Sequence, residues 1–349
     1  MVRLFRGSSP RPIIEYLTTD NEEGVNWVKI GDVPTSGRII TSTEEKITKE
    51  GAKKSRHVYV GDLILSNSMS YGLPYIMGIE GCIHDGWFVL RDYEQNFNKD
   101  YLCDLLISDI VQKQYKKIAA GGVVQNISSD LVNSVYISIP SLDEQRKIAG
   151  LLSLIDERIA TQNKVIDKLQ SLIKGIAHRI SKQDKSNIRL SECLQCSSST
   201  LQESDVAEVG QYPVYGANGV VGYLDTYNTT DEAIYIIKDG SGVGSVSYIN
   251  GKCSATGTLN ILQAKDGFSL RYLYFMLKVF SFEPYKTGMA IPHIYFKDYG
   301  KAKIFCPPYE LQNKYADLLS KIEQKAIAEQ KILDNLCSQK QYLLRQMFI

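Results

Sequence analysis

The sequence repeats itself at a constant offset of 167 residues. Pro140 falls on Pro307 and Gln145 falls on Gln312, and the register continues without a gap into the segments that follow. The preceding loop, 121–127, falls on its counterpart at the same offset. Two helices often resemble each other by chance, but an ungapped match over about 60 residues that includes a loop indicates a true internal repeat. The chain is therefore predicted to hold two copies of one unit, each a globular part followed by a helix.

Each copy ends in a long segment with heptad spacing, 143–181 in the first copy and 310–349 in the second. Apolar residues recur at alternating steps of four and three, the pattern of a helix that packs lengthwise against another helix. Both seams carry a polar residue at the same point of the repeat, Gln162 and Glu329, and polar seam residues can fix the register of such pairs at a cost in stability. The predicted helix-seam residues are Leu152, Ile155, Ile159, Ile166, Leu169, Leu319, Ile322, Leu333, Leu336 and Leu343.

The globular parts, 1–142 and 182–309, have short β-rich runs bounded by glycine, such as 58–65, and helical patterns near 101–113 and 272–280. The predicted fold is α/β (α+β), with two tandem mixed α/β domains separated by two long helices. We expect the helices to form an antiparallel coiled coil with pseudo-two-fold symmetry. Such a rod with two related heads suits a bipartite linear target, and a DNA duplex is one. The alternative is a pair of coiled coils that serve homodimerisation.

Composition excludes several other classes of protein. The chain is 44% hydrophobic and 23% charged, as in ordinary globular proteins. Its net charge is +1, so non-specific affinity for phosphates is predicted to be weak. A partner is therefore expected to supply part of the affinity for DNA. The sequence has no apolar run of membrane-spanning length, and its first residues have no apolar core long enough for a signal peptide, so we expect neither feature. Seven irregularly spaced cysteines favour reduced thiols, and hence a cytoplasmic protein.

Three segments resemble catalytic or cofactor motifs but lack a required group. Cys306–Tyr309 is similar to the Pro-Pro-Tyr motif of adenine methyltransferases, yet cysteine has no side-chain oxygen to accept a hydrogen bond from the target amine. Gly240–Gly244 is glycine-rich, but the following residues predict a strand, not the helix of a nucleotide loop. Cys193 and Cys196 form a single pair where a zinc site needs more ligands. We therefore predict no catalytic residue, no metal site and no bound cofactor.

The candidate contact residues lie in loops that recur in both copies and in short basic runs. Gln and Asn pair with adenine edges and Lys with guanine, whereas Ser and Tyr serve phosphates. For each residue the alternative is a role in the loop's own architecture or on a solvated surface. The candidate DNA-binding residues are Lys53, Lys54, Arg56, Asn67, Ser70, Tyr71, Lys116, Lys117, Gln125, Asn126, Lys238, Asp239, Ser241, Lys286, His293 and Tyr295.

The sequence resembles a known family, the specificity (S) subunit of type I restriction-modification systems, HsdS. The resemblance covers nearly the whole chain. The segments that carry it are Arg6–Pro12, Trp27–Val33, Lys238–Ser241, Ile291–Ile294 and the two helix starts Pro140–Gln145 and Pro307–Gln312.

The resemblance implies that 1–142 and 182–309 are target-recognition domains, each reading one half of a gapped double-stranded DNA site. The helices are then spacers that set the gap and dock two methyltransferase (M) subunits. Restriction/translocase (R) subunits join for DNA cleavage. S-adenosylmethionine, ATP and Mg are implied for those partner subunits and none of them for this chain.

Two alternatives stay open. One is the specificity module of a type IIB-like restriction enzyme, whose chemistry would also reside elsewhere. The other is a coiled-coil interaction protein with no role in DNA binding.

Overall fold

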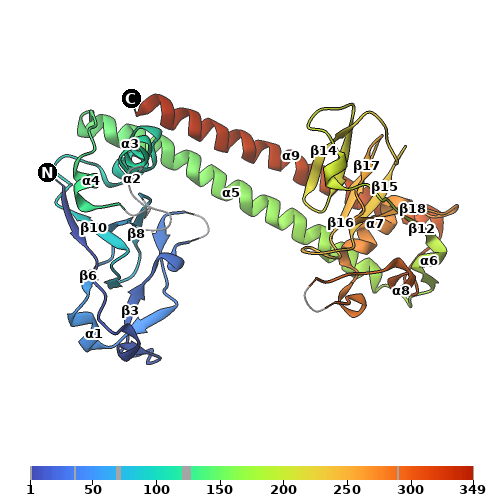
Figure 1. Cartoon of the computed structure of the whole chain (residues 1–349), viewed down its shortest axis with the longest axis horizontal. Coiled ribbons are helices and arrows are strands. Elements are labelled where there is room, and N and C mark those ends of the chain that lie inside the picture. The colour runs from blue at the N-terminus through green and yellow to red at the C-terminus, as the bar shows by residue number, and fades with distance from the viewer. Residues whose placement is uncertain (1, 35–36, 68–71, 120–126, 289–290, 349) are drawn as a thin grey trace. The chain divides into compact units, whose positions relative to one another are not determined.

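The computed structural model describes residues 2–34, 37–67, 72–119, 127–288 and 291–348. The chain divides into two compact units, which we call unit 1 (Met1–Thr161 with Leu333–Ile349) and unit 2 (Gln162–Ile332). Two long helices, α5 (Leu142–Ser181) and α9 (Tyr309–Met347), each contribute one part to each unit (Figure 1). Each unit therefore combines a globular part with portions of both long helices.

Unit 1 contains two five-stranded sheets among its described residues. The first has the order β1 (Arg3–Arg6), β10 (Trp87–Arg91), β7 (Leu63–Ser66), β8 (Pro74–Met77) and β4 (Ile39–Ile40). The second has the order β2 (Leu17–Thr18), β5 (Glu45–Ile47), β3 (Val25–Val28), β9 (Gly81–Ile83) and β6 (Arg56–Val58).

The central strands of the first sheet are apolar on both faces because both faces are covered. Ile64 and Val89 pack with Val28 and Ile83 of the second sheet. The alternating residues point the other way and pack against the helices of unit 1: Leu63, Leu65, Phe88 and Leu90. A strand with two buried faces reads as a continuous hydrophobic run, which is what the sequence has at Trp87–Leu90.

The globular part of unit 1 contains the helices α1 (Lys49–Lys53), α2 (Lys99–Ile107), α3 (Asp109–Ala119) and α4 (Ser129–Asn133). Of these, α1, α2 and α4 start at capping side chains. Thr48, Asn98 and Ser128 each accept a hydrogen bond from the backbone amide three residues on. The prediction of a single helix near 101–113 is wrong, because the extended backbone of Ser108 separates α2 from α3.

Unit 2 has the mixed α/β character expected of it. One sheet has the order β12 (Leu194–Ser198), β18 (Leu259–Ala264), β15 (Ala233–Ile237) and β16 (Val246–Ile249). A second has the order β14 (Gly219–Leu224), β13 (Tyr212–Gly216) and β17 (Ser254–Ala255), and β11 (Ile188–Arg189) pairs with β19 (Lys303–Ile304). Its short helices are α6 (Leu190–Cys193), α7 (Leu270–Val279) and α8 (Phe296–Tyr299).

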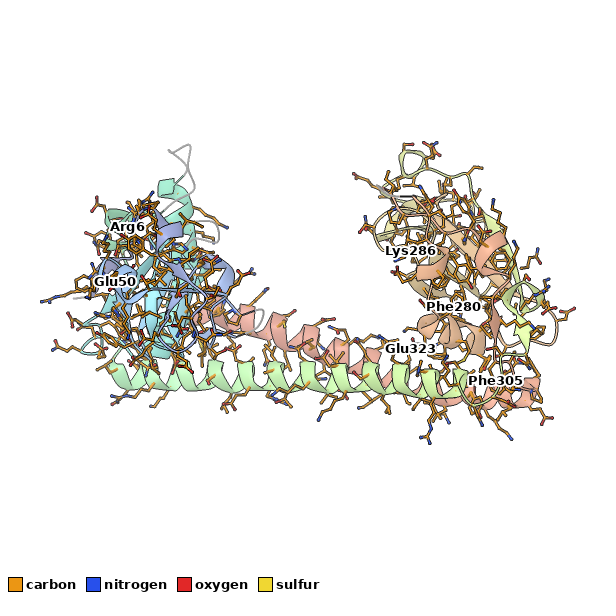
Figure 2. The ribbon with its side chains drawn as sticks, turned by 90° about the horizontal axis from the view of Figure 1, so that it is seen from below. Arg6, Glu50, Phe280, Lys286, Phe305 and Glu323 are labelled. Carbon is orange, nitrogen blue, oxygen red and sulfur yellow. The ribbon has the colours of Figure 1, made fainter. Side chains whose placement is uncertain are left out.

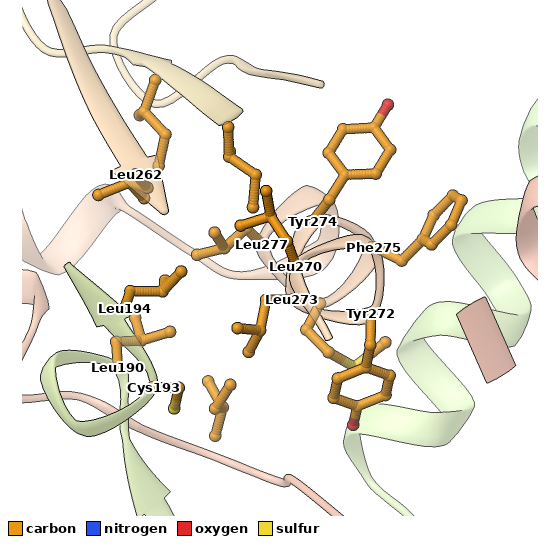
Figure 3. Packing of buried hydrophobic residues seen from close by; sticks show 14 of the residues in the cluster. Leu190, Cys193, Leu194, Leu262, Leu270, Tyr272, Leu273, Tyr274, Phe275 and Leu277 are labelled. Carbon is orange, nitrogen blue, oxygen red and sulfur yellow. The ribbon is translucent and has the colours of Figure 1, made fainter. Parts of the chain in front are cut away.

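Helix α7 forms the centre of the core of unit 2 because it is apolar almost all round. Tyr272 through Leu277 are buried. They pack in one cluster with Leu262 of the sheet, with Ala177 of α5 and with Leu319 of α9 (Figure 3). The sheet and the long helices thus share one hydrophobic core within this unit.

The predicted helix-seam residues lie on sides of α5 and α9 that are shielded from solvent. All ten predicted seam residues are buried or half-buried. Within unit 2, Gln162 donates a hydrogen bond to the carbonyl of Glu329 (3.0 Å), and Tyr315 donates to the side chain of Gln183 (2.7 Å). Contact partners therefore run in opposite directions along the two helices, which pair antiparallel. None of the described helices has both the length and the apolar composition of a membrane span.

A buried glutamine joins the globular part to a long helix in both units. The side-chain oxygen of Gln145 accepts from the amide of Asn98 (2.8 Å), the N-cap of α2, and its amide donates to the carbonyl of Pro140 (3.0 Å). Gln312 makes the same two bonds, accepting from the amide that precedes α7 (2.9 Å) and donating to the carbonyl five residues earlier (2.8 Å). This joint explains why the two helix starts repeat in sequence.

Candidate nucleic-acid interface

In unit 2, two loops that lie far apart in the sequence meet just beyond β15. The segments 238–240 and 292–294 run antiparallel, and the amides that flank the meeting point donate across it at 2.9 and 3.0 Å. Asp239 and His293 are therefore opposite each other as a non-hydrogen-bonded pair. Side chains of such a pair lie on one face and close together.

The backbone of His293 is held on its other side as well. Its amide donates to the carbonyl of Thr287 (2.7 Å) and its carbonyl accepts from the Thr287 amide (2.9 Å). The backbone beside Thr287 needs glycine at position 288, where φ is +89° and a Cβ atom would lie 2.3 Å from the carbonyl oxygen of Ile291. The backbone of His293 thus lies between that of Asp239 on one side and that of Thr287 on the other, and it is held in place from both sides.

The side chains at this point form an exposed polar and aromatic patch, the His293 platform, made of Asp239, His293, Tyr295 and Lys297. His293 Nδ1 lies 2.7 Å from Asp239 Oδ1, and both side chains are 35% exposed. The ring of Tyr295 stacks on the imidazole with centroids 6.5 Å apart, and the Lys297 ammonium lies 5.2 Å from the Tyr295 ring centroid. A carboxylate at Nδ1 leaves Nε2 as the second hydrogen-bonding atom of the imidazole.

The other candidates of unit 2 differ in their surroundings. Lys286 pairs with Glu283 at 2.5 Å, and Figure 2 shows Lys286 in a part of the unit away from the long helices. Ser241 is exposed. Lys238 precedes Asp239 on an extended backbone, so its side chain faces the other way. Burial raises the pKa of the Cys196 thiol to about 11, and the positive charge of Lys238 opposes that shift.

In unit 1, the first basic run forms an exposed cationic surface between α1 and β6. Lys53, Lys54 and Arg56 are all exposed. The Lys54 ammonium lies 4.6 Å from the ring centroid of Tyr16, and the Arg56 guanidinium lies 5.5 Å from that of Phe5. These aromatic contacts hold the cations in place, so less side-chain freedom is lost when they meet a phosphate.

The remaining candidates of unit 1 fall into three groups. Lys116 and Lys117 are exposed in the last turn of α3. Asn67 is 3% exposed and its side-chain amide donates to the carbonyl of Asp85 (2.9 Å), so it belongs to the architecture of its loop and we leave it out of the contact set. The last group lies outside the described residues: Ser70, Tyr71, Gln125 and Asn126.

One backbone hydrogen bond recurs in both units and links the predicted loops in the same way. The Ile127 amide donates to the carbonyl of Asn67 at 2.9 Å, and the Ile294 amide donates to the carbonyl of Lys238 at 2.9 Å. Ile127 and Ile294 are repeat counterparts. The two loops that the repeat singled out are therefore anchored to each other in each copy.

Sequence reasoning missed Lys297, whose contact with Tyr295 is set by the first turn of α8 and has no local sequence signature. It also missed a cleft of about 1080 Å³ in unit 1, lined by residues that include Trp27, Arg11 and Lys29. The two cations of the cleft already have carboxylate partners, Arg11 with Asp85 (3.0 Å) and Lys29 with Glu45 (2.8 Å). The cleft therefore offers no unpaired positive charge among these residues.

The fold consists of two mixed α/β parts, each of which continues into a long helix. The family described as "Type I restriction modification DNA specificity domain" matches residues 10–171 and again 183–337. Because these matches span most of the chain, it belongs to this family, with two such domains in tandem.

Individual relatives agree with this assignment. The chain is 26% identical over 265 residues to a putative type I specificity subunit of Mycoplasma genitalium, covering 68% of each sequence. It is 31% identical over 121 residues to a putative type I specificity subunit of Mycoplasma pneumoniae, covering 33% of this chain and 40% of the relative. Among solved structures, it is similar to the type I restriction-modification S subunit of M. genitalium, with a TM-score of 0.62, 19% identity, and coverage of 100% and 94% of the two chains. A second solved structure, described as bearing on assembly and conformational transition of the type I system, has a TM-score of 0.59 at 18% identity.

Proposed function

We propose that this chain is the DNA sequence-specificity subunit of a type I restriction-modification complex and that it reads a bipartite, gapped site in double-stranded DNA. The observation that carries the proposal is the doubling of the specificity domain along the chain. Each copy anchors its two candidate contact loops with an equivalent backbone bond. Two related domains with different loop side chains suit two different half-sites.

In this proposal 1–142 and 182–309 are the two target-recognition domains. The basic surface of Lys53, Lys54 and Arg56 meets phosphates of one half-site, and the His293 platform meets the other. Cations fix the register of a protein on DNA, whereas base-edge contacts give sequence preference. Because the net charge is only +1, the sequence-independent affinity of the chain for DNA phosphates is small. Tight binding therefore depends on partner subunits.

The segments 143–181 and 310–349 act as spacer helices that set the gap and dock two methyltransferase subunits. Leucines that remain outside the antiparallel seam support a docking role, since Leu151 and its repeat counterpart Leu318 are 41% and 49% exposed. The chain itself is non-catalytic in this proposal. S-adenosylmethionine, ATP and Mg belong to the methyltransferase and restriction/translocase subunits, and the complex works in the cytoplasm.

The test is a genome-wide map of N6-methyladenine in the source organism with and without this gene. We expect deletion to remove methylation at one gapped two-part motif, and the map then gives both half-sites and the gap. Reintroducing the gene must restore the same motif. If deletion changes no motif in cells that express the methyltransferase partner, the proposal is wrong.

A further inference from the structure

We propose that His293 is a specificity-determining residue of the second target-recognition domain and that Asp239 is the positioning residue that presents it to DNA. The inference rests on the proposed DNA-reading function. It assigns a chemical class of target to this position: a base that offers an exocyclic amine, adenine or cytosine.

The backbone supplies the first argument. His293 is hydrogen-bonded to Thr287 on one side and lies in register with Asp239 on the other. A residue fixed from both sides presents its side chain in one direction, which direct readout of a base edge requires. The backbone register places Asp239 and His293 opposite each other, which brings the carboxylate within reach of the imidazole.

The side chains supply the second argument. Asp239 Oδ1 lies 2.7 Å from His293 Nδ1. When the imidazole is neutral, this carboxylate favours the tautomer with the proton on Nδ1, and Nε2 is then a hydrogen-bond acceptor. In the major groove the donors are the N6 amine of adenine and the N4 amine of cytosine. Phosphates repel a carboxylate, so Asp239 is expected to contact His293 and not the DNA backbone.

The neighbours of His293 complete the site. The Tyr295 ring lies beside the imidazole, with centroids 6.5 Å apart and an interplanar angle of 25°. The Lys297 ammonium lies over the Tyr295 ring, 5.2 Å from the ring centroid, and adds a cation to the platform. A base contact next to a phosphate contact is the usual division of roles at such an interface.

The repeat supplies the third argument. The counterpart of His293 in the first copy is Asn126, and each precedes an isoleucine whose amide bonds to the loop opposite, Ile127 to Asn67 and Ile294 to Lys238. The anchoring bond is thus common to both copies, whereas the polar residue before it differs. That is the pattern expected of a position that distinguishes two half-sites.

The experiment uses the full-length chain in complex with its methyltransferase partner and a plasmid library that randomises one half-site at a time. Base-resolved methylation is measured for His293→Ala, Asp239→Ala and Asp239→Asn. We expect the two alanine variants to accept further bases at the same single position of one half-site, with formerly rejected sites gaining about tenfold or more in relative methylation rate. Asp239→Asn keeps an oxygen that accepts from Nδ1–H, so the original preference is expected to return.

Controls separate this role from a purely structural one. Asp231→Ala removes another exposed carboxylate of unit 2 and is expected to leave the motif unchanged. His293→Asn keeps a polar side chain at a folded position and is expected to alter the preferred base at the same place. An unchanged motif in His293→Ala and His293→Asn overturns the specificity role.

Two further outcomes are decisive. If His293→Ala relaxes the motif but Asp239→Ala does not, the positioning role is wrong. If both Asp239 variants lower the melting temperature and abolish methylation alike, the pair is structural and the inference is refuted. A wild-type complex that methylates no gapped site refutes the proposed function itself, an outcome distinct from an altered preference at one base.

Discussion

The joint formed by Gln312 gives the sharpest test of how the second domain is attached to its long helix. Gln312 is 2% exposed and makes hydrogen bonds to the Ser269 amide and the Pro307 carbonyl. Substitution by alanine removes both bonds. It leaves Ser269, the residue at the N-cap position of α7, and Pro307, which precedes α9, with backbone groups that are buried and unpaired.

The magnitude follows from those two groups. A buried backbone donor or acceptor without a partner costs about 1–3 kcal/mol, so Gln312→Ala is expected to destabilise unit 2 by about 2–6 kcal/mol. The cavity left by the side chain adds to this cost. Gln324 lies on the same helix and is exposed, and Gln324→Ala is expected to change stability by less than about 0.5 kcal/mol.

Native-state hydrogen exchange of the full chain is the suitable assay, because a chain of two units need not unfold in one step. The Ser269 amide and the first turn of α7 are expected to exchange at least about tenfold faster in Gln312→Ala, since 1.4 kcal/mol corresponds to a factor of ten. Exchange in unit 1 is expected to stay unchanged. If the Gln312 and Gln324 variants exchange equally at Ser269, the joint does not stabilise the domain and the reasoning is wrong.

Three further predictions concern the seam and the basic surface. Leu319→Asp places an unpaired charge at a site of 0% exposure and is expected to lower the melting temperature measured by circular dichroism, whereas the neighbouring Leu318→Asp is not. Hydrogen bonds from Lys325 and Gln162 hold the pKa of Glu329 in the folded protein below its ordinary value of 4.5. The ionised Glu329 side chain therefore stabilises the folded state above pH 4.5, and this stabilisation is lost as the pH falls through the lower pKa of the folded state. Glu329→Gln is expected to remove this pH dependence from thermal unfolding curves, and equal curves for both proteins would contradict it. In a plot of the logarithm of the DNA-binding constant against the logarithm of salt concentration, Arg56→Ala is expected to make the slope shallower by about one unit. The methylated motif is expected to stay the same.

Much of the fold was predictable because the seam and the repeat are strong patterns. A heptad spacing carried over many turns has few alternatives to a long helix that packs against another. The repeat then required the same unit twice. Burial of Leu152 and Leu319 at equivalent positions follows directly from that register.

Other features depended on contacts that no local pattern encodes. The break between α2 and α3 rests on one residue, Ser108, whose hydroxyl bonds to the carbonyl of Leu105 (2.6 Å), and serine is otherwise tolerated in helices. The burial of Asn67 could not be predicted either, because its partner, Asp85, is distant in the sequence. Polar residues in a loop look alike in sequence whether they face solvent or bond to their own backbone.

The two copies share what orients the loops and differ in what the loops present. Gln145 and Gln312 make the same two bonds, and the amides of Ile127 and Ile294 are anchored alike. These contacts use backbone groups and buried amides, so they do not restrict the side chains at the surface. If His293 reads a base as we propose, a change such as His293→Asn alters one half-site while the domain, its joint to the helix and the other half-site remain as they were. A protein that must read two different sequences across a fixed gap requires this separation, because any coupling between the reading residues and the helix joint would change the gap whenever the sequence preference changed.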